Sequence, residues 1–463
     1  MLRAKTRTMP ESYDESSDPY WAIHEDTWGR EVWSAQMAGS LLVEPEPVSD
    51  SAQFGHEVDY KQRKKLIERQ RAVLRDNLTT MMTVLGSLHS WHAALTEHLV
   101  AEISPRGGST FAQREALRQV LKALFRLGVI NTLKPSGWNI GWDERATVWL
   151  PGDPTHFRDE VVPLLTAVEL ASVLCGSPWA TSNQVMTRHN ILAHECALRI
   201  AEGHAIEHVV GERFARHEDL LPDHVLDAQP GGRAAADAVL VCPTGDSIAI
   251  EIVASHGDLD AKVDRWAARL RHTSGLRCQG ARTLDVRVVF VLALRHNDSD
   301  NHGEALRQVR KAMRQAAHRH QVPTEQLWWR IGVVGWPQWF PGPEVGSEDF
   351  SALKVMLVDP DAREYTSSFA RWAPVDVSMV SIGELQDRRR VLNSIAATPA
   401  FLRQPITSLP PHLTTDIQCA FREAVKFRRQ GQTLNGIPNV GHYDGGRPSP
   451  RVLGPAVWSG DAT

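Results

Sequence analysis

Two carboxylates, Asp237 and Glu251, stand at positions where an acidic side chain is costly. Asp237 begins a short apolar run that ends at Val241, and Glu251 lies inside a second apolar run, Ser247 to Val253. The Gly-containing segment Pro243 to Asp246 separates the runs, which is the pattern of a β-hairpin. A carboxylate in a buried strand costs several kcal/mol unless a cation meets it. The sequence therefore predicts that a cation lies beside these acids.

Divalent metal binding is the chemistry that this pair predicts. Paired hairpin strands can place Asp237 and Glu251 side by side, and two convergent carboxylates can hold Mg²⁺ or Mn²⁺, with water and substrate phosphate completing the shell. The backbone carbonyl of Ile252 is a further candidate oxygen ligand. Lys262, on a helix predicted from Leu259 to His272, can add an ammonium that stabilises developing negative charge. The alternative is structural, with Asp237 capping a turn and Glu251 pairing with an arginine.

The hairpin resembles the core of PD-(D/E)XK nucleases, in which an acid begins one strand and an acid-x-Lys triplet lies on the next. Asp237 matches the first acid and Glu251 the second. Ala236 stands where the motif has proline, and Val253 stands where it has lysine. The resemblance implies catalytic roles for Asp237, Glu251 and Lys262, with Lys262 replacing the missing lysine from the following helix, as in some branches of the fold.

A wider resemblance covers about residues 66–334. With His189 and His194-Glu195 upstream of the hairpin, the chain looks most like the replication-relaxation (MobC-type) proteins of actinobacterial plasmids and conjugative elements. This resemblance implies double-stranded DNA and mobile-element transfer proteins as partners. Glu195 is either an extra carboxylate beside the metal or an exposed glutamate, and His194 is either a site residue or a packed side chain.

A helix-turn-helix pattern precedes the hairpin. Ala94 to Ile103 is predicted as a short helix, Ser104 to Gly108 as a turn, and Phe111 to Leu127 as a longer helix capped by Ser109 or Thr110. Strands at Val129 to Leu133 and Ala146 to Leu150 would enclose a wing. This order predicts a winged helix domain.

The longer helix has one apolar and one basic face. Its basic residues recur every four positions and are the predicted DNA-binding residues: Arg114, Arg118, Lys122 and Arg126. A helix with this pattern suits the major groove. The alternative is that the basic row only keeps the surface soluble.

Composition limits the other function classes. The 463 residues carry a net charge of −4, so a DNA-binding surface must be a local patch. The five cysteines are scattered without a CxxC pair, which argues against a thiolate zinc site and a disulfide framework and favours the reducing cytoplasm. No apolar run reaches the ~20 residues of a membrane helix, and the N-terminus lacks the apolar core of a signal peptide.

The predicted fold class is a multi-domain α/β protein, with a winged helix domain followed by a PD-(D/E)XK-like mixed sheet. The predicted segments are a disordered region (1–60), the winged helix domain (61–151), a connector containing a helix from Glu160 to Leu174 (152–183), the nuclease-like domain (184–340), a C-terminal extension (341–430) and a flexible tail (431–463). Within the nuclease-like domain, strand, strand, helix, strand, helix, strand follow one another, as expected for helices covering a sheet.

Two classes of function remain open. The chain is either a Mg²⁺- or Mn²⁺-dependent DNA endonuclease or nickase of plasmid or conjugative-element replication and transfer, or a non-catalytic winged helix DNA-binding or assembly protein with a decayed nuclease fold. Mg²⁺-dependent nicking of supercoiled DNA separates them.

Overall fold

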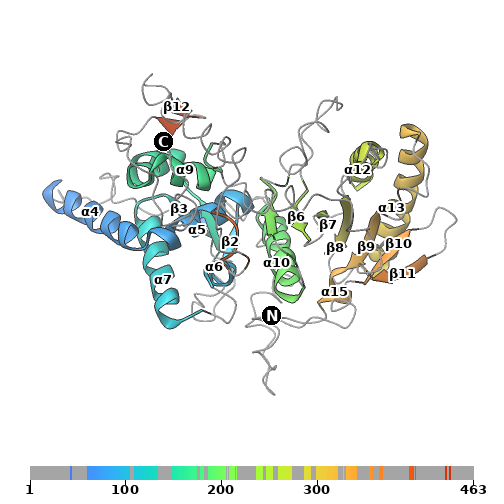
Figure 1. Ribbon diagram of the computed structural model, residues 1–463, viewed down its shortest axis with the longest axis horizontal. Helices are drawn as coiled ribbons and strands as arrows, with labels where there is room; N and C mark the ends of the chain where they lie inside the picture. Colours follow the sequence, from blue (N-terminus) through green and yellow to red (C-terminus); the bar gives the residue numbers. More distant parts are fainter. Residues whose placement is uncertain are drawn as a thin grey trace, which may run out of the picture. The chain divides into compact units, whose positions relative to one another are not determined.

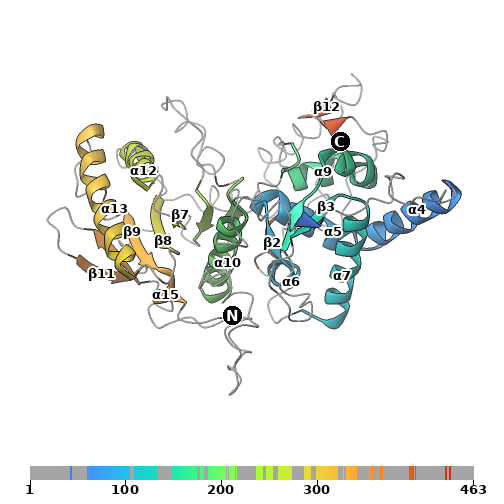
Figure 2. The same cartoon turned by 180° about the vertical axis from the view of Figure 1, so that it is seen from behind.

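The structure is a computed structural model of the chain. It describes residues 42–43, 60–104, 109–133, 148–174, 178–181, 186–204, 206, 208–213, 215, 236–242, 247–253, 259–273, 286–293, 299–321, 327, 330–340, 354–358, 364–368, 396–400, 402, 433–434 and 437–438. The chain divides into two compact units. The helical unit comprises residues 31–191 and 386–463, and the sheet unit comprises residues 1–30 and 192–385. Figures 1 and 2 show their elements from opposite sides.

The helical unit combines helices with a small antiparallel sheet. Its longer helices are α4 (Tyr60–Asp76), α5 (Leu78–Trp91), α6 (Thr96–Ile103), α7 (Phe111–Arg126) and α9 (Ala167–Leu174). Its sheet has the order β1 (Leu42–Val43), β3 (Ile130–Leu133), β4 (Val148–Pro151), β2 (Ala94–Leu95). The first two residues of the helix predicted at 94–103 are therefore a strand, because Ala94 and Leu95 pair with β4. The predicted wing between β3 and β4 and the turn at 105–108 lie outside the described residues.

The start and end of α7 follow local sequence signals. The Thr110 hydroxyl accepts a hydrogen bond from the Gln113 backbone N–H at 3.2 Å, and the Gln113 side chain accepts one from the Thr110 N–H at 2.8 Å. This reciprocal pair is a capping box. Gly128, just beyond the helix, has a φ of +72°, a conformation that glycine adopts without strain.

The segment predicted as a connector belongs to the core of the helical unit. Instead of one helix from Glu160 to Leu174, it forms π-helical Phe157–Val161, 3₁₀-helical Val162–Leu164 and then α9. Pro163 explains the interruption, because proline lacks the N–H that a continuous helix needs. The Phe157 ring stacks on Trp179 with centroids 4.3 Å apart.

A segment from the distant C-terminal part of the chain completes the helical unit. Ala396 N–H donates to the Ser172 carbonyl at 3.0 Å, and residues 396–398 are buried. The segment crosses α5 at Gly86, where a Cβ would lie 2.6 Å from the Ala397 nitrogen. Glycine is therefore required at this crossing unless the backbone shifts.

A mixed sheet of seven strands forms the centre of the sheet unit. Its order is β11 (Glu364–Ser368), β10 (Lys354–Val358), β9 (Ile331–Gly335), β8 (Val286–Leu292), β7 (Ser247–Val253), β6 (Ala238–Val241), β5 (His208–Gly211). Strands β7, β8 and β9 are parallel, and the other neighbours are antiparallel. Every residue of β7 and β8 is buried, as expected for parallel strands covered on both faces.

Helices connect and flank this sheet. α12 (Leu259–Thr273) connects β7 to β8, and α13 (Ser299–His320) connects β8 to β9. The two helices pack together, and the Asp264 carboxylate of α12 lies 2.8 Å from Arg319 and 3.0 Å from His320 of α13. α10 (Thr187–Gly203) precedes the sheet and α15 (Trp336–Trp339) follows β9. No helix in the described part of the chain combines the length and apolar character needed to cross a membrane.

Candidate active site

The hairpin brings Asp237 and Glu251 to the same end of its paired strands. The pairing of β6 with β7 ends at Ala238 and Ile250, and Glu251 follows Ile250 directly in the chain. The Asp237 N–H donates to the Ile250 carbonyl at 3.0 Å, so Asp237 lies against the residue that precedes Glu251. The two acids therefore meet where β7 approaches its carboxyl end, as the sequence predicted.

Lys262 joins the two acids from α12. Its Nζ lies 2.7 Å from Oε2 of Glu251 and 3.3 Å from Oδ2 of Asp237. The helix begins only six residues after β7 ends, so its first turns return over the strand. The structure thus brings together the three residues that the sequence assigned to catalysis.

Two further donors hold the carboxylates. The Ile252 N–H donates to Oδ2 of Asp237 at 2.7 Å, and the Trp266 indole N–H donates to Oε1 of Glu251 at 2.8 Å. The Arg269 guanidinium lies over the Trp266 ring, 5.4 Å from its centroid. Trp266 was missed by the sequence analysis. Its spacing of four residues from Lys262 on one helix was the available signal, because such residues share a helix face.

Burial is the largest influence on the pKa values of Glu251 and Lys262. Glu251 is 2% exposed and Asp237 6% exposed. Burial raises the pKa of Glu251, the charge of Asp237 raises it further, and Lys262 and Trp266 act in the opposite direction. For Lys262, burial disfavours the ammonium, but the two carboxylates together outweigh it and raise its pKa. Two carboxylates and one ammonium together give the site a net charge of −1.

The donor set fits a hard divalent cation. Mg²⁺ is held by one or two carboxylates and keeps several waters, and Asp237 and Glu251 supply two carboxylates. Among the described residues, no group of three or more His, Cys, Asp or Glu side chains is placed to hold a metal. A metal here would therefore depend on water and substrate oxygens for its remaining ligands. Because Lys262 already contacts both carboxylates, metal binding requires a shift of its ammonium or use of other carboxylate oxygens.

Glu195 has a different partner. Its carboxylate forms an ion pair with Arg199, one turn along α10, and the Arg199 guanidinium lies 4.7 Å from the centroid of the Phe340 ring. His194 and Glu195 are both buried. The reading of Glu195 as an exposed glutamate is therefore wrong, whereas the reading of His194 as a packed side chain agrees with its burial.

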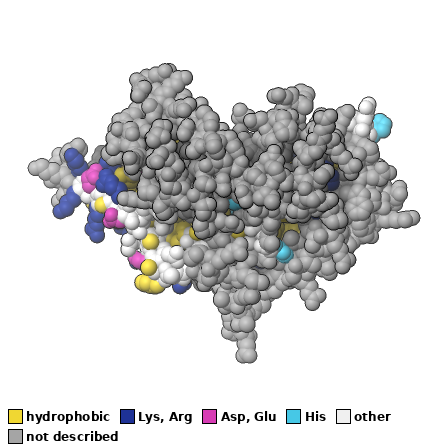
Figure 3. Space-filling model, in the orientation of Figure 1, with side chains coloured by type: hydrophobic (Ala, Val, Ile, Leu, Met, Phe, Trp, Pro, Cys, Tyr) yellow, Lys and Arg dark blue, Asp and Glu magenta, His cyan; other side chains and the backbone are white. Residues whose placement is uncertain are grey.

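The predicted DNA-binding residues lie on the open face of α7. Arg114, Arg118, Lys122 and Arg126 are exposed, and the buried residues of the helix line its other face. The Arg118 side chain forms an ion pair with Glu115 at 3.0 Å. Figure 3 shows dark-blue lysines and arginines with a few magenta acids on the visible surface of the helical unit.

The chain matches no protein-family model, no curated protein and no solved structure. The resemblances to PD-(D/E)XK nucleases and to replication-relaxation proteins therefore remain sequence-based predictions.

Proposed function

We propose that this protein is a Mg²⁺- or Mn²⁺-dependent phosphodiesterase that acts on DNA. The observation that supports this proposal best is the convergence of Asp237, Glu251 and Lys262 at one end of the hairpin. Charge also favours it: a divalent cation would leave the site with an excess positive charge, which a phosphodiester anion would neutralise. The resemblance to replication-relaxation proteins favours plasmid or conjugative-element DNA as the substrate, and mobile-element transfer proteins as partners.

Each residue has a distinct role in this proposal. Asp237 and Glu251 hold the cation, whose chemistry is to activate water and to offset charge on the phosphate. Ile252 and Trp266 fix the two carboxylates by donating hydrogen bonds. An ammonium has three donors, and Lys262 directs two toward the carboxylates. The remaining donor can meet a phosphate oxygen, because 20% of the Lys262 side chain is exposed.

The helical unit supports DNA binding. The order of strand β2, helices α6 and α7, and strands β3 and β4 supports the proposal of a winged helix domain, in which α7 would be the recognition helix. Phe111, in the first turn of α7, is 80% exposed and offers an apolar contact to a base edge. Replacing Arg114, Arg118 and Lys122 together with alanine is expected to weaken DNA binding and its salt dependence. Unchanged affinity of a folded triple variant would rule out this role for α7.

A second candidate function is a non-catalytic DNA-binding protein. The specific observation in its favour is that Lys262 contacts both carboxylates in a largely buried ion-pair cluster. Such a cluster can serve folding alone. The substitutions at the Pro and Lys positions of the nuclease motif also favour this alternative.

Nicking of supercoiled plasmid separates the two candidates. Purified wild-type protein, with Mg²⁺ or Mn²⁺, is expected to convert supercoiled DNA to the nicked form, and EDTA is expected to abolish this activity. The variants Glu251→Gln and Asp237→Asn should lose it, because the amides keep the shape of the side chains but remove the charge that holds the cation. Nicking that persists unchanged in Glu251→Gln would come from another site and would favour the second candidate.

A further inference from the structure

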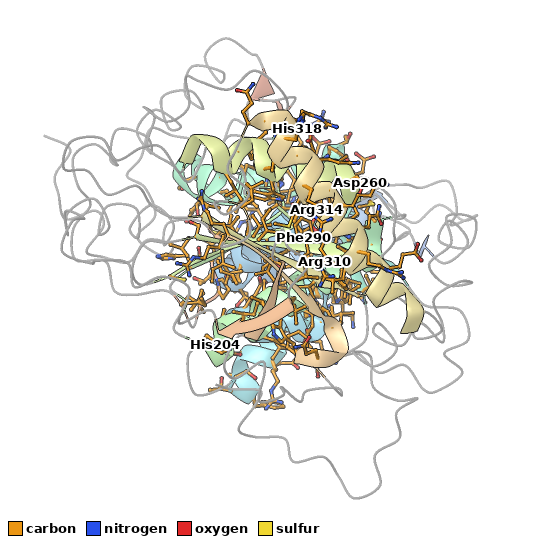
Figure 4. All side chains as sticks on the ribbon, turned by 90° about the vertical axis from the view of Figure 1, so that its right-hand side faces the viewer. His204, Asp260, Phe290, Arg310, Arg314 and His318 are labelled. Carbon is orange, nitrogen blue, oxygen red and sulfur yellow. The ribbon has the colours of Figure 1, made fainter. Side chains whose placement is uncertain are left out.

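Helix α13 presents a row of basic residues to solvent in the sheet unit. Arg307, Lys311, Arg314 and His318 are exposed, and Arg310 is half-buried beside them. Figure 4 shows Arg310, Arg314 and His318 following one another along the helix. The spacing of four, three and four residues places Arg307, Lys311, Arg314 and His318 on one face. We call these four residues the α13 stripe.

The buried apolar face of α13 determines that the stripe faces solvent. Ala305, Val309, Ala312, Met313 and Ala316 are buried and alternate with the stripe at helical spacing. Rotation of the helix would expose these apolar residues to water, so the residues of the stripe are held outward. The stripe therefore faces solvent on the sheet unit.

Charge on α13 is unbalanced. From residue 303 to 320 the helix has five lysines and arginines and one acid, Glu304, although the whole chain is net negative. Burial lowers the pKa of the Arg310 guanidinium, and the positive charge of Arg314 lowers it further. Cations in the middle of the helix therefore repel one another, and a polyanion placed along the stripe would relieve this repulsion.

The length of the stripe suits a nucleic-acid backbone. Eleven residues separate Arg307 from His318, which corresponds to about 16 Å along a helix. Phosphates of one DNA strand recur about every 3.4 Å along the duplex axis, so several phosphates face a surface of this length. Lysine and arginine contacts to phosphates set position and orientation without reading the sequence.

The end of the stripe is tied to the helix that carries the candidate active site. Asp264 of α12 pairs with Arg319 and His320, next to the last residue of the stripe. Lys262 precedes Asp264 by two residues on α12. We propose that the α13 stripe binds the phosphate backbone of DNA independently of its sequence, as a contact surface in addition to that of α7. A role for this surface in nuclease action rests on the proposed function. Binding of DNA by the stripe does not itself require catalysis.

The test is a salt titration of DNA binding by the full-length protein in EDTA. Fluorescence anisotropy with a labelled duplex of arbitrary sequence compares wild type with the triple variant Arg307→Ala/Lys311→Ala/Arg314→Ala. Each lost phosphate contact lowers the slope of log K against log salt by about 0.9, so the triple variant is expected to lose about 2 to 3 units of slope. Its affinity at low salt should fall at least tenfold.

Two control variants make the result specific. Gln308→Ala/Gln315→Ala changes neutral side chains on the same helix and should leave the slope unchanged. Arg307→Lys/Arg314→Lys keeps the charges and should keep most of the slope, which separates charge from helix structure. Circular dichroism establishes that each variant is folded.

The outcomes are separable from those of the nuclease proposal. Equal slopes for wild type and the folded triple variant would overturn the α13 stripe as a DNA surface, and the surface would then serve a protein partner or only solubility. Absence of any DNA binding by wild type would overturn it as well. Loss of slope in the triple variant supports the inference even when plasmid nicking is absent, because EDTA removes catalysis from the measurement.

Discussion

The Lys262 ammonium of helix α12 lies 2.7 Å from Oε2 of Glu251 on strand β7. This contact supplies the cation that an acid inside an apolar strand requires. The same ammonium also reaches Asp237, so one side chain from the helix meets both strands of the hairpin. The candidate site is therefore also part of what holds α12 on the sheet.

Removal of Lys262 should destabilise the protein. Lys262→Met leaves two buried carboxylates without their ammonium, and loss of one partner of a buried ion pair costs about 3–5 kcal/mol. Urea unfolding in EDTA measures this loss. Because Mn²⁺ can replace the missing charge, its addition should restore part of the stability.

A control on the same helix isolates the buried charge. Arg265 is exposed on α12, so Arg265→Met should change the free energy of unfolding by less than about 0.5 kcal/mol. A Lys262→Met variant as stable as wild type would show that the ion-pair cluster is not needed for folding.

Trp266 should act as a positioning residue for Glu251. Trp266→Phe keeps an aromatic ring beneath Arg269 but removes the N–H that donates to Glu251. Loss of such a supporting hydrogen bond typically lowers metal affinity by about 10–100-fold. Titration with Mn²⁺ measures this change directly. Trp336→Phe, which alters a buried tryptophan of α15, is the matched control and should bind Mn²⁺ as wild type does.

Two glycines in helices should respond in opposite directions to alanine. At Gly86 a new Cβ would lie 2.6 Å and 2.7 Å from backbone atoms of the segment 396–397, so Gly86→Ala should destabilise the helical unit by about 1–3 kcal/mol. At Gly303 nothing lies within 4 Å, so Gly303→Ala should stabilise the sheet unit by about 0.5–1 kcal/mol through helix propensity. Thermal unfolding of both variants measures the difference. Equal effects would contradict the tight crossing at Gly86.

The thiol of Cys196 should stay unreactive at alkaline pH. Burial raises its pKa well above the usual range, and the nearby Arg199 offsets this only in part. The thiolate is the reactive form, so the folded protein should not be alkylated at Cys196 at about pH 8 to 9, where an ordinary thiol reacts. Cys242, which is partly exposed, serves as the internal reference. Mass spectrometry of native protein after iodoacetamide treatment measures both sites, and equal labelling would contradict the burial of Cys196.

Local patterns in the sequence predicted much of the site. The hairpin follows from two apolar runs around a short Gly-containing segment, and it brings Asp237 and Glu251 to the same end of the paired strands. The limits of α7 follow from its cap and from Gly128. These features depend on neighbours in the sequence, which is why they could be read without a structure.

Contacts between distant segments could not be read in this way. Residues 396–398 pack on α5 although more than three hundred residues separate the two segments in the sequence. No local sequence pattern indicates this contact. The partner of Glu195 was ambiguous, because an acid on a helix can face solvent, a metal or a neighbouring arginine. The role of Trp266 appears only when the indole N–H is seen to reach Glu251.

Metal binding tests the central claim most directly, because it does not depend on knowing the DNA target. Isothermal titration of full-length protein with Mn²⁺ compares wild type with Glu251→Gln, each first shown to be folded. The proposed site predicts one bound ion per chain in wild type and loss of most of that affinity in Glu251→Gln. Absence of Mn²⁺ binding by wild type, or equal binding by the variant, would contradict a metal site at Asp237 and Glu251.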